Sequence, residues 1–300
     1  MKNFFMLDRN IIDLMKKYNR NVNINDDNAS EKLQFLLVND VVGNFFSPLF
    51  SIIEGKVIKK TRESGEVIIE KTPNRKIREL IKEEASVVHE FIKNARTDYN
   101  FLISNEKFFA KNIYENEVDG FINEKIKFLS EVSKKIGILK EVSKRENDYL
   151  AFKEVCKQYA FLKDQPFVLF SIMYIFGSSR SAKLLKYGSS KFVAYNPISD
   201  FNHVKLFNKL RYNERLEGKF NISFLSLDSD IDFINEVIKT NNVRKKRISN
   251  FSEMLMTDWS PDYEAIDRDI PNIEKNGSNK DIFYKCYKDF YGYDLRDYAK

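Results

Sequence analysis

The chain has 300 residues, of which 43% are hydrophobic and 31% are charged, and its formal net charge is +6 at pH 7. This length allows one large domain or two smaller ones with ample core. Its two cysteines, Cys156 and Cys286, lie far apart, which argues against a disulfide framework or a thiolate metal site and favours a reducing cytoplasm. The positive charge permits nucleic-acid binding without requiring it. The most apolar run, residues 167–176, is shorter than the roughly 20 residues of a membrane span, so we expect no membrane partner.

Near the amino terminus, a short apolar run of residues 4–7 is followed by Asp8. Apolar residues at helical spacing follow Asn10, which predicts a buried strand, a tight turn and a helix capped by Asn10. Open α/β sheets place their functional groups at the carboxyl ends of parallel strands. Asp8 is therefore the first candidate functional residue.

The next segments predict a helix over 31–46 and a short helix that begins after Ser47 and ends at Gly55. Glu54 then lies in the last turn, where a negative charge opposes the helix dipole, so another role for this side chain is indicated. Alternating apolar residues over 56–71 predict a β-hairpin that turns at Ser64 and Gly65.

The middle of the chain is strongly helical, and its carboxyl-terminal part adds two acids in a strand-and-helix pattern. A short strand is expected over 191–196, Asp200 is expected to open a helix, and Asp228 is expected to close a strand over 220–227. Asp230 and Asp232 follow in the next helix start. Helices are predicted over residues 74–104, 119–145, 147–163, 166–176 and 180–187.

Asp8, Glu54, Asp200 and Asp228 form the candidate site, because acids at strand ends and helix starts gather at one edge of a parallel sheet. Four adjacent carboxylates repel one another, and a Mg²⁺ or Mn²⁺ ion relieves that repulsion. Such an ion supports phosphodiester hydrolysis without histidine, cysteine or serine. The alternative for each acid is a plain role as a turn residue or a helix cap.

The motifs around these acids resemble the PIN-domain family of metal-dependent nucleases. The matching stretches are residues 7–12, 51–54, 199–201 and 226–233. The resemblance implies an α/β fold with a three-layer core around a mainly parallel sheet, formed by residues 1–55 and 190–243. Residues 56–189 would be a mostly helical insertion and 244–300 a helical tail. It also implies that Asp8, Glu54, Asp200 and Asp228 ligate Mg²⁺ or Mn²⁺, with Asp230 as a helper.

The expected function is hydrolysis of nucleic acid, RNA rather than DNA, and the resemblance implies a setting in toxin or phage-defence systems. A protein antitoxin or partner subunit, and an oligomer, would fit that setting. Two features depart from the family pattern. Arg9 stands where the family usually carries a small residue, and it would either bind a phosphate or neutralise the site and replace the metal. The gap between Glu54 and Asp200 is also longer than is common in the family. The alternative is therefore a catalytically inactive PIN-like binding or scaffold protein. Further helper candidates are Asn10, Asp232 and His203, and the nucleic-acid-binding candidates are Arg244, Lys245, Lys246 and Arg247.

Overall fold

The computed structural model describes residues 2–61, 67–112, 122–137, 144–211, 218, 220–249, 252–272 and 279–298. Contacts divide the chain into two units. The first unit comprises Met1–Val118 and Phe207–Ser229, and the second comprises Asp119–Leu206 and Asp230–Lys300. Their boundaries differ from the predicted division, because residues 56–118 belong to the unit that holds the parallel sheet and residues 190–206 do not.

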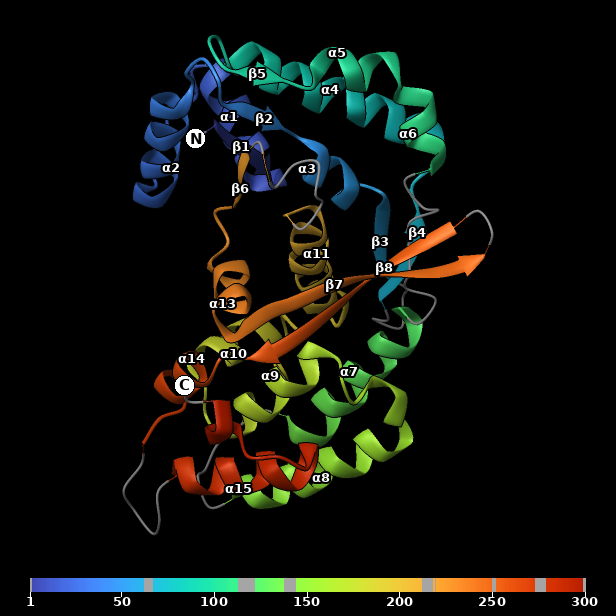
Figure 1. The fold of residues 1–300 in the computed structure, drawn as a ribbon, viewed down its shortest axis with the longest axis vertical. Helices are drawn as coiled ribbons and strands as arrows, with labels where there is room; N and C mark the ends of the chain where they lie inside the picture. Colours follow the sequence, from blue (N-terminus) through green and yellow to red (C-terminus); the bar gives the residue numbers. More distant parts are fainter. Residues whose placement is uncertain are drawn as a thin grey trace. The chain divides into compact units, whose positions relative to one another are not determined.

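A parallel sheet of four strands lies at the centre of the first unit (Figure 1). The strands are β1 (Lys2–Leu7), β2 (Phe45–Ser47), β5 (Arg96–Thr97) and β6 (Phe220–Leu225), in the order β5-β2-β1-β6. The register pairs Leu7 with Leu225 and Met6 with Ser47, so the strands end along one edge, here called the carboxyl edge. The predicted α/β class with a mainly parallel central sheet is confirmed.

Helices and a hairpin complete the first unit. They are α1 (Arg9–Asn19), α2 (Asp27–Asn39), α3 (Leu49–Glu54), α4 (Asn74–Phe91), α5 (Tyr99–Ser104), α6 (Glu106–Asn112) and the pair β3 (Val57–Thr61) and β4 (Val67–Lys71). The hairpin confirms the prediction, and its turn at Ser64 and Gly65 lies outside the described residues. One face of β1 packs Phe5 and Leu7 into the core of α1 and α4, while Phe4 stacks on Phe45 on the other face.

Two predicted helices of this unit are shorter than expected, and short strands take their place. The helix expected over 31–46 ends at Asn39 and leads into β2. The helix expected over 74–104 ends at Phe91, because the Asp40 carboxylate accepts the backbone N–H groups of Lys93, Asn94 and Ala95 at 2.7–2.9 Å. These bonds lead the chain into β5, beside β2.

The second unit is largely a helical bundle. Its helices are α7 (Ile122–Ile136), α8 (Arg145–Gln158), α9 (Pro166–Ile175), α10 (Ser179–Leu185), α11 (Tyr195–Arg211, whose last turns belong to the first unit), α13 (Ser229–Val237), α14 (Tyr263–Asp269) and α15 (Asn279–Tyr291). Residues 167–175 are all buried, as expected for a central core helix. Among the helices described here, none has the length and apolar character needed to cross a bilayer.

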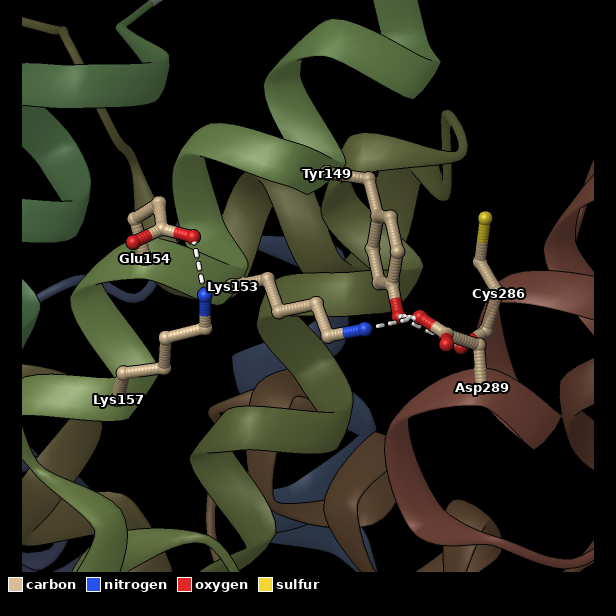
Figure 2. A network of polar contacts seen from close by, with 6 residues as sticks. All are labelled: Tyr149, Lys153, Glu154, Lys157, Cys286 and Asp289. Atoms are coloured by element: carbon tan, nitrogen blue, oxygen red, sulfur yellow. Dashed lines mark hydrogen bonds and ion pairs between the residues drawn. The ribbon is translucent and has the colours of Figure 1, made fainter.

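Polar contacts tie α8 to α15 inside this bundle (Figure 2). The Tyr149 hydroxyl lies 2.9 Å from the Cys286 carbonyl oxygen and 2.7 Å from Asp289 Oδ2. Lys153 Nζ approaches the same carboxylate oxygen at 2.6 Å. These two donors lower the pKa of Asp289, so the carboxylate stays charged and holds the two helices together.

Two expectations for the second unit are wrong. Residues 191–196 form no strand, and α11 begins at Tyr195, since Pro197 is tolerated in the first helical turn, where a backbone N–H has no helical acceptor. The tail after residue 243 is only partly helical. A long antiparallel hairpin of β7 (Ile238–Ser249) and β8 (Ser252–Pro261) precedes α14.

Candidate functional site at the carboxyl edge

Asp8 lies directly after β1 and is only 6% exposed. It caps α1, since its Oδ1 accepts the backbone N–H of Arg9 at 2.8 Å, so the cap is Asp8 and not Asn10 as predicted. Its Oδ2 accepts Asn10 Nδ2 at 2.9 Å and the Ser226 hydroxyl at 2.7 Å. The carboxylate is therefore fixed in orientation by Asn10 and Ser226.

Ser226 connects Asp8 to Asp228 across the ends of β1 and β6. Its Oγ donates to Asp8 Oδ2 and accepts the backbone N–H of Asp228 at 2.9 Å and Asn10 Nδ2 at 3.0 Å. Asn10 Oδ1 in turn accepts the backbone N–H of Leu227 at 3.0 Å. Residues separated by more than 200 positions thus share one polar cluster, which Asp228 joins through its backbone N–H.

Ser226→Ala should destabilise the protein by about 1–3 kcal/mol, because the backbone N–H of Asp228 and the Asn10 amide both lose a partner in a nearly buried place. Urea unfolding of the two proteins measures this difference. Ser30→Ala on the exposed part of α2 is the matched control, and its free energy of unfolding should change by less than about 0.5 kcal/mol. Equal losses for both variants would contradict the role given to Ser226.

Asp98 is a second acid at this edge, and it falls within the helix that the sequence predicts over 74–104. It follows β5, and its Oδ2 accepts the hydroxyl of Ser47, the last residue of β2. Its Oδ1 is buried and has no hydrogen-bond partner among the described residues. Burial raises the pKa of Asp98 to about 6, so this carboxyl can exchange a proton near neutral pH.

The Arg9 guanidinium donates to the Ser51 carbonyl oxygen at 3.3 Å, and among the described residues no ion pair within 4 Å joins it to Asp8. Glu84 on α4 is 1% exposed. Burial raises the pKa of Glu84 to about 7, although the Ser51 hydroxyl and the positive charge of Arg9 act in the opposite direction. Glu84 is thus a buried acid in a segment for which the sequence predicts only a helix.

Glu54 is the last residue of α3, as predicted, and it is partly buried. Pro48 is the residue before the helix, one position later than the predicted cap, while Ser47 Oγ accepts the Leu49 N–H at 3.2 Å. Helix α3 contacts both β1 and α1, so Glu54 belongs to the same unit as Asp8 and Asp228.

The remaining predicted residues belong to the second unit. Asp200 lies inside α11 rather than at its start, and His203 follows on the same helix. Asp230 and Asp232 lie in the first turn of α13. The basic run of residues 244–247 lies on β7, where the backbone is described and the side chains are not. The candidate site is therefore built from the first unit alone.

Oxygen donors at the carboxyl edge have the chemistry that Mg²⁺ and Mn²⁺ require. Within the described part of the chain, no three His, Cys, Asp or Glu side chains are grouped closely enough to share a metal ion. Mg²⁺ is commonly held by one or two carboxylates together with waters and substrate phosphates. Among the described residues, the edge therefore does not form a closed cage of four acids.

In comparisons with known proteins, no family model, no curated protein and no solved structure matches the chain.

Proposed function

We propose that the carboxyl edge of the first unit hydrolyses phosphodiester bonds in nucleic acid with the help of Mg²⁺ or Mn²⁺. The observation that carries this proposal is that one serine hydroxyl binds both the Asp8 carboxylate and the backbone N–H of Asp228, at the strand ends where α/β proteins hold their ligands. RNA is proposed as the substrate, and a PIN-like nuclease in a toxin or phage-defence setting as the context, on the resemblance of the motifs alone.

Each residue has a distinct task in this proposal. Asp8 and Asp228 would hold the ion, which supplies an activated water and charge stabilisation for the leaving oxygen. Ser226 and Asn10 keep the Asp8 carboxylate in one orientation through their hydrogen bonds. Asp98 can hold a proton on Oδ1, since its Oδ2 is already engaged by Ser47, and so it is the candidate general acid.

The test uses metal-stripped full-length protein with labelled RNA and DNA strands of the same sequence. Addition of Mn²⁺ should raise the melting temperature, because an ion that binds only the folded state stabilises it, and should start RNA cleavage. Excess EDTA should reverse both effects, and DNA should be cut more slowly. An unchanged melting temperature together with intact RNA would overturn the proposal.

A second candidate is a binding protein that keeps this architecture without catalysis. It is favoured by the three hydrogen bonds that already engage the Asp8 carboxylate as a helix cap and a strand connector. In that case Mn²⁺ would not stabilise the protein, while RNA would still be retained in a filter-binding assay. Retention without cleavage at any Mn²⁺ concentration selects this candidate.

A further inference from the structure

Two phenylalanine side chains are exposed on neighbouring short helices of the first unit. Phe101 on α5 is 60% exposed and Phe108 on α6 is 63% exposed. Both helices pack on α4 (Figure 1), and the ring of Phe109 contacts both exposed rings, with centroids 5.6 Å from Phe101 and 6.0 Å from Phe108. Phe109 itself packs against buried residues of α4 and α5. The three rings therefore form one supported group, here called the aromatic platform.

The helix that carries Phe108 lies in a positively charged region. Glu106 begins α6, and its carboxylate is covered by two cations, Arg78 at 2.5 Å and Lys82 at 3.0 Å. Lys107 and Lys111 are exposed on the same helix, and none of the described acids lies within ion-pair distance of either lysine. Four cations around one carboxylate leave a surplus of three positive charges at this surface.

Exposed rings and unpaired cations together match the chemistry of single-stranded nucleic acid. An unpaired base stacks on an aromatic ring whatever its sequence, and cations follow the phosphates of the strand. In a duplex the bases already stack on one another, so their faces are not free for a protein ring. Surfaces that bind another protein are depleted of lysine. The charge therefore favours a polyanion with free bases over an apolar protein partner.

Helix α5 joins the aromatic platform to the carboxyl edge. Asp98 is the residue before α5, and its carbonyl oxygen accepts the Leu102 N–H at 2.9 Å within the first turn. Phe101 lies in that same turn, and three residues of helix rise only about 4.5 Å along the axis. The platform is therefore continuous with the carboxyl that is the candidate general acid.

We propose that the aromatic platform is a binding site for single-stranded nucleic acid, in which unpaired bases stack on Phe101 and Phe108 while phosphates contact Lys107 and Lys111. The inference deepens the proposed function and rests on it in one respect, because the platform would hold the strand whose phosphodiester bond reaches the carboxyl edge. The affinity itself needs neither the metal ion nor the reaction, so it is measured without them.

The first experiment measures the binding of a labelled single-stranded RNA by fluorescence anisotropy in EDTA. Phe101→Leu with Phe108→Leu keeps an apolar surface and removes both rings, so the affinity should fall at least about fivefold for each ring. Phe101→Tyr with Phe108→Tyr keeps the rings and should bind as wild type does. The matched control is Phe161→Leu, a residue 54% exposed in the second unit, which should also bind as wild type. A leucine double variant that binds as tightly as wild type overturns the inference.

The second experiment tests the two lysines through the salt dependence of the same affinity. Each phosphate contact contributes about 0.7 to the slope of log affinity against log salt concentration for a single strand. Lys107→Gln with Lys111→Gln should therefore reduce this slope by about 1.4. Lys134→Gln with Lys135→Gln removes the same charge from exposed positions on α7 and should leave the slope unchanged. Equal slopes for the two pairs would mean that net charge and not this surface binds RNA.

The cleavage assay separates this inference from the proposed function. The leucine double variant should raise KM for RNA at least about fivefold and leave kcat within about twofold of wild type, since the platform binds the strand without taking part in the reaction. Wild type that binds RNA through the platform and never cleaves it contradicts the proposed function alone. Cleavage with an unchanged KM in the leucine variant contradicts the platform alone. A wild-type protein that ignores RNA and sediments as a dimer would assign this surface to a second copy of the chain.

Discussion

Asp8→Asn should reduce Mn²⁺-dependent RNA cleavage at least about 100-fold. The substitution removes the charge that a metal ion would neutralise, and such an ion supplies several kcal/mol of transition-state stabilisation. Asparagine is as good a helix cap as aspartate, and its side-chain oxygen can still accept the Arg9 backbone N–H. Its amide nitrogen replaces Oδ2 and cannot accept Asn10 Nδ2 or the Ser226 hydroxyl, so some stability is lost together with the activity. Single-turnover cleavage rates at saturating Mn²⁺ measure the effect.

Asp26→Asn is the matched control for this prediction. Asp26 caps α2 in the same unit, and its Oδ1 accepts the Ala29 N–H at 2.7 Å, so the change removes the same charge from the same kind of position. Its cleavage rate should stay within about twofold of wild type. Similar rates for Asp8→Asn and wild type would place the chemistry elsewhere and remove Asp8 from the site.

The second large effect is a pH dependence of stability that comes from Glu84. Its pKa is about 7 in the folded protein and 4.5 in the unfolded chain, so between these pH values the folded state binds more protons. The free energy of unfolding therefore falls as pH rises through this window, by about 3 kcal/mol in total, and becomes constant above it. Below pH 4.5 the carboxyl is protonated in both states, and its contribution is fully present.

Comparing Glu84→Gln with wild type isolates this effect from other titrating groups. The two proteins should have similar free energies of unfolding at pH 4, and the variant should be more stable by about 3 kcal/mol at pH 8. Urea unfolding at half-unit pH steps measures the difference. Glu83→Gln, which changes an exposed acid, should show no such trend. A difference between Glu84→Gln and wild type that does not vary with pH would contradict the buried, proton-binding state of Glu84.

The sequence predicted the elements that have a clear local pattern. The apolar run before Asp8, the short helix that ends at Glu54 and the strand before Asp228 all exist, and the Asp8 carboxylate and the Asp228 backbone N–H bind the same serine hydroxyl. Strands β2 and β5 have three and two residues, which is too short for any periodicity to appear. The pattern around Asp98 therefore predicts a helix and gives no sign of the strand end at which Asp98 lies.

Tertiary contacts explain other differences between the predicted and the observed elements. Asp40, distant in sequence, ends α4 by accepting three backbone N–H groups, which no local pattern reveals. Asp200 resembled a helix start only because Pro197 suggested a break before it. Glu84 did carry a signal. It stands at helical spacing with Ile77, Ile81 and Val88, all buried, and an acid on such an apolar stripe indicates a special environment.

The pairing of β1 with β6 has a consequence for synthesis of the protein. Residues 2–7 pair with residues 220–225, so more than 200 residues must leave the ribosome before the fourth strand of the sheet can form. Until then Asp8 lacks Ser226, and the acids of the edge are not assembled. Contacts this distant in sequence also make folding slow. A growing chain therefore lacks the complete carboxyl edge until residues 220–225 have emerged.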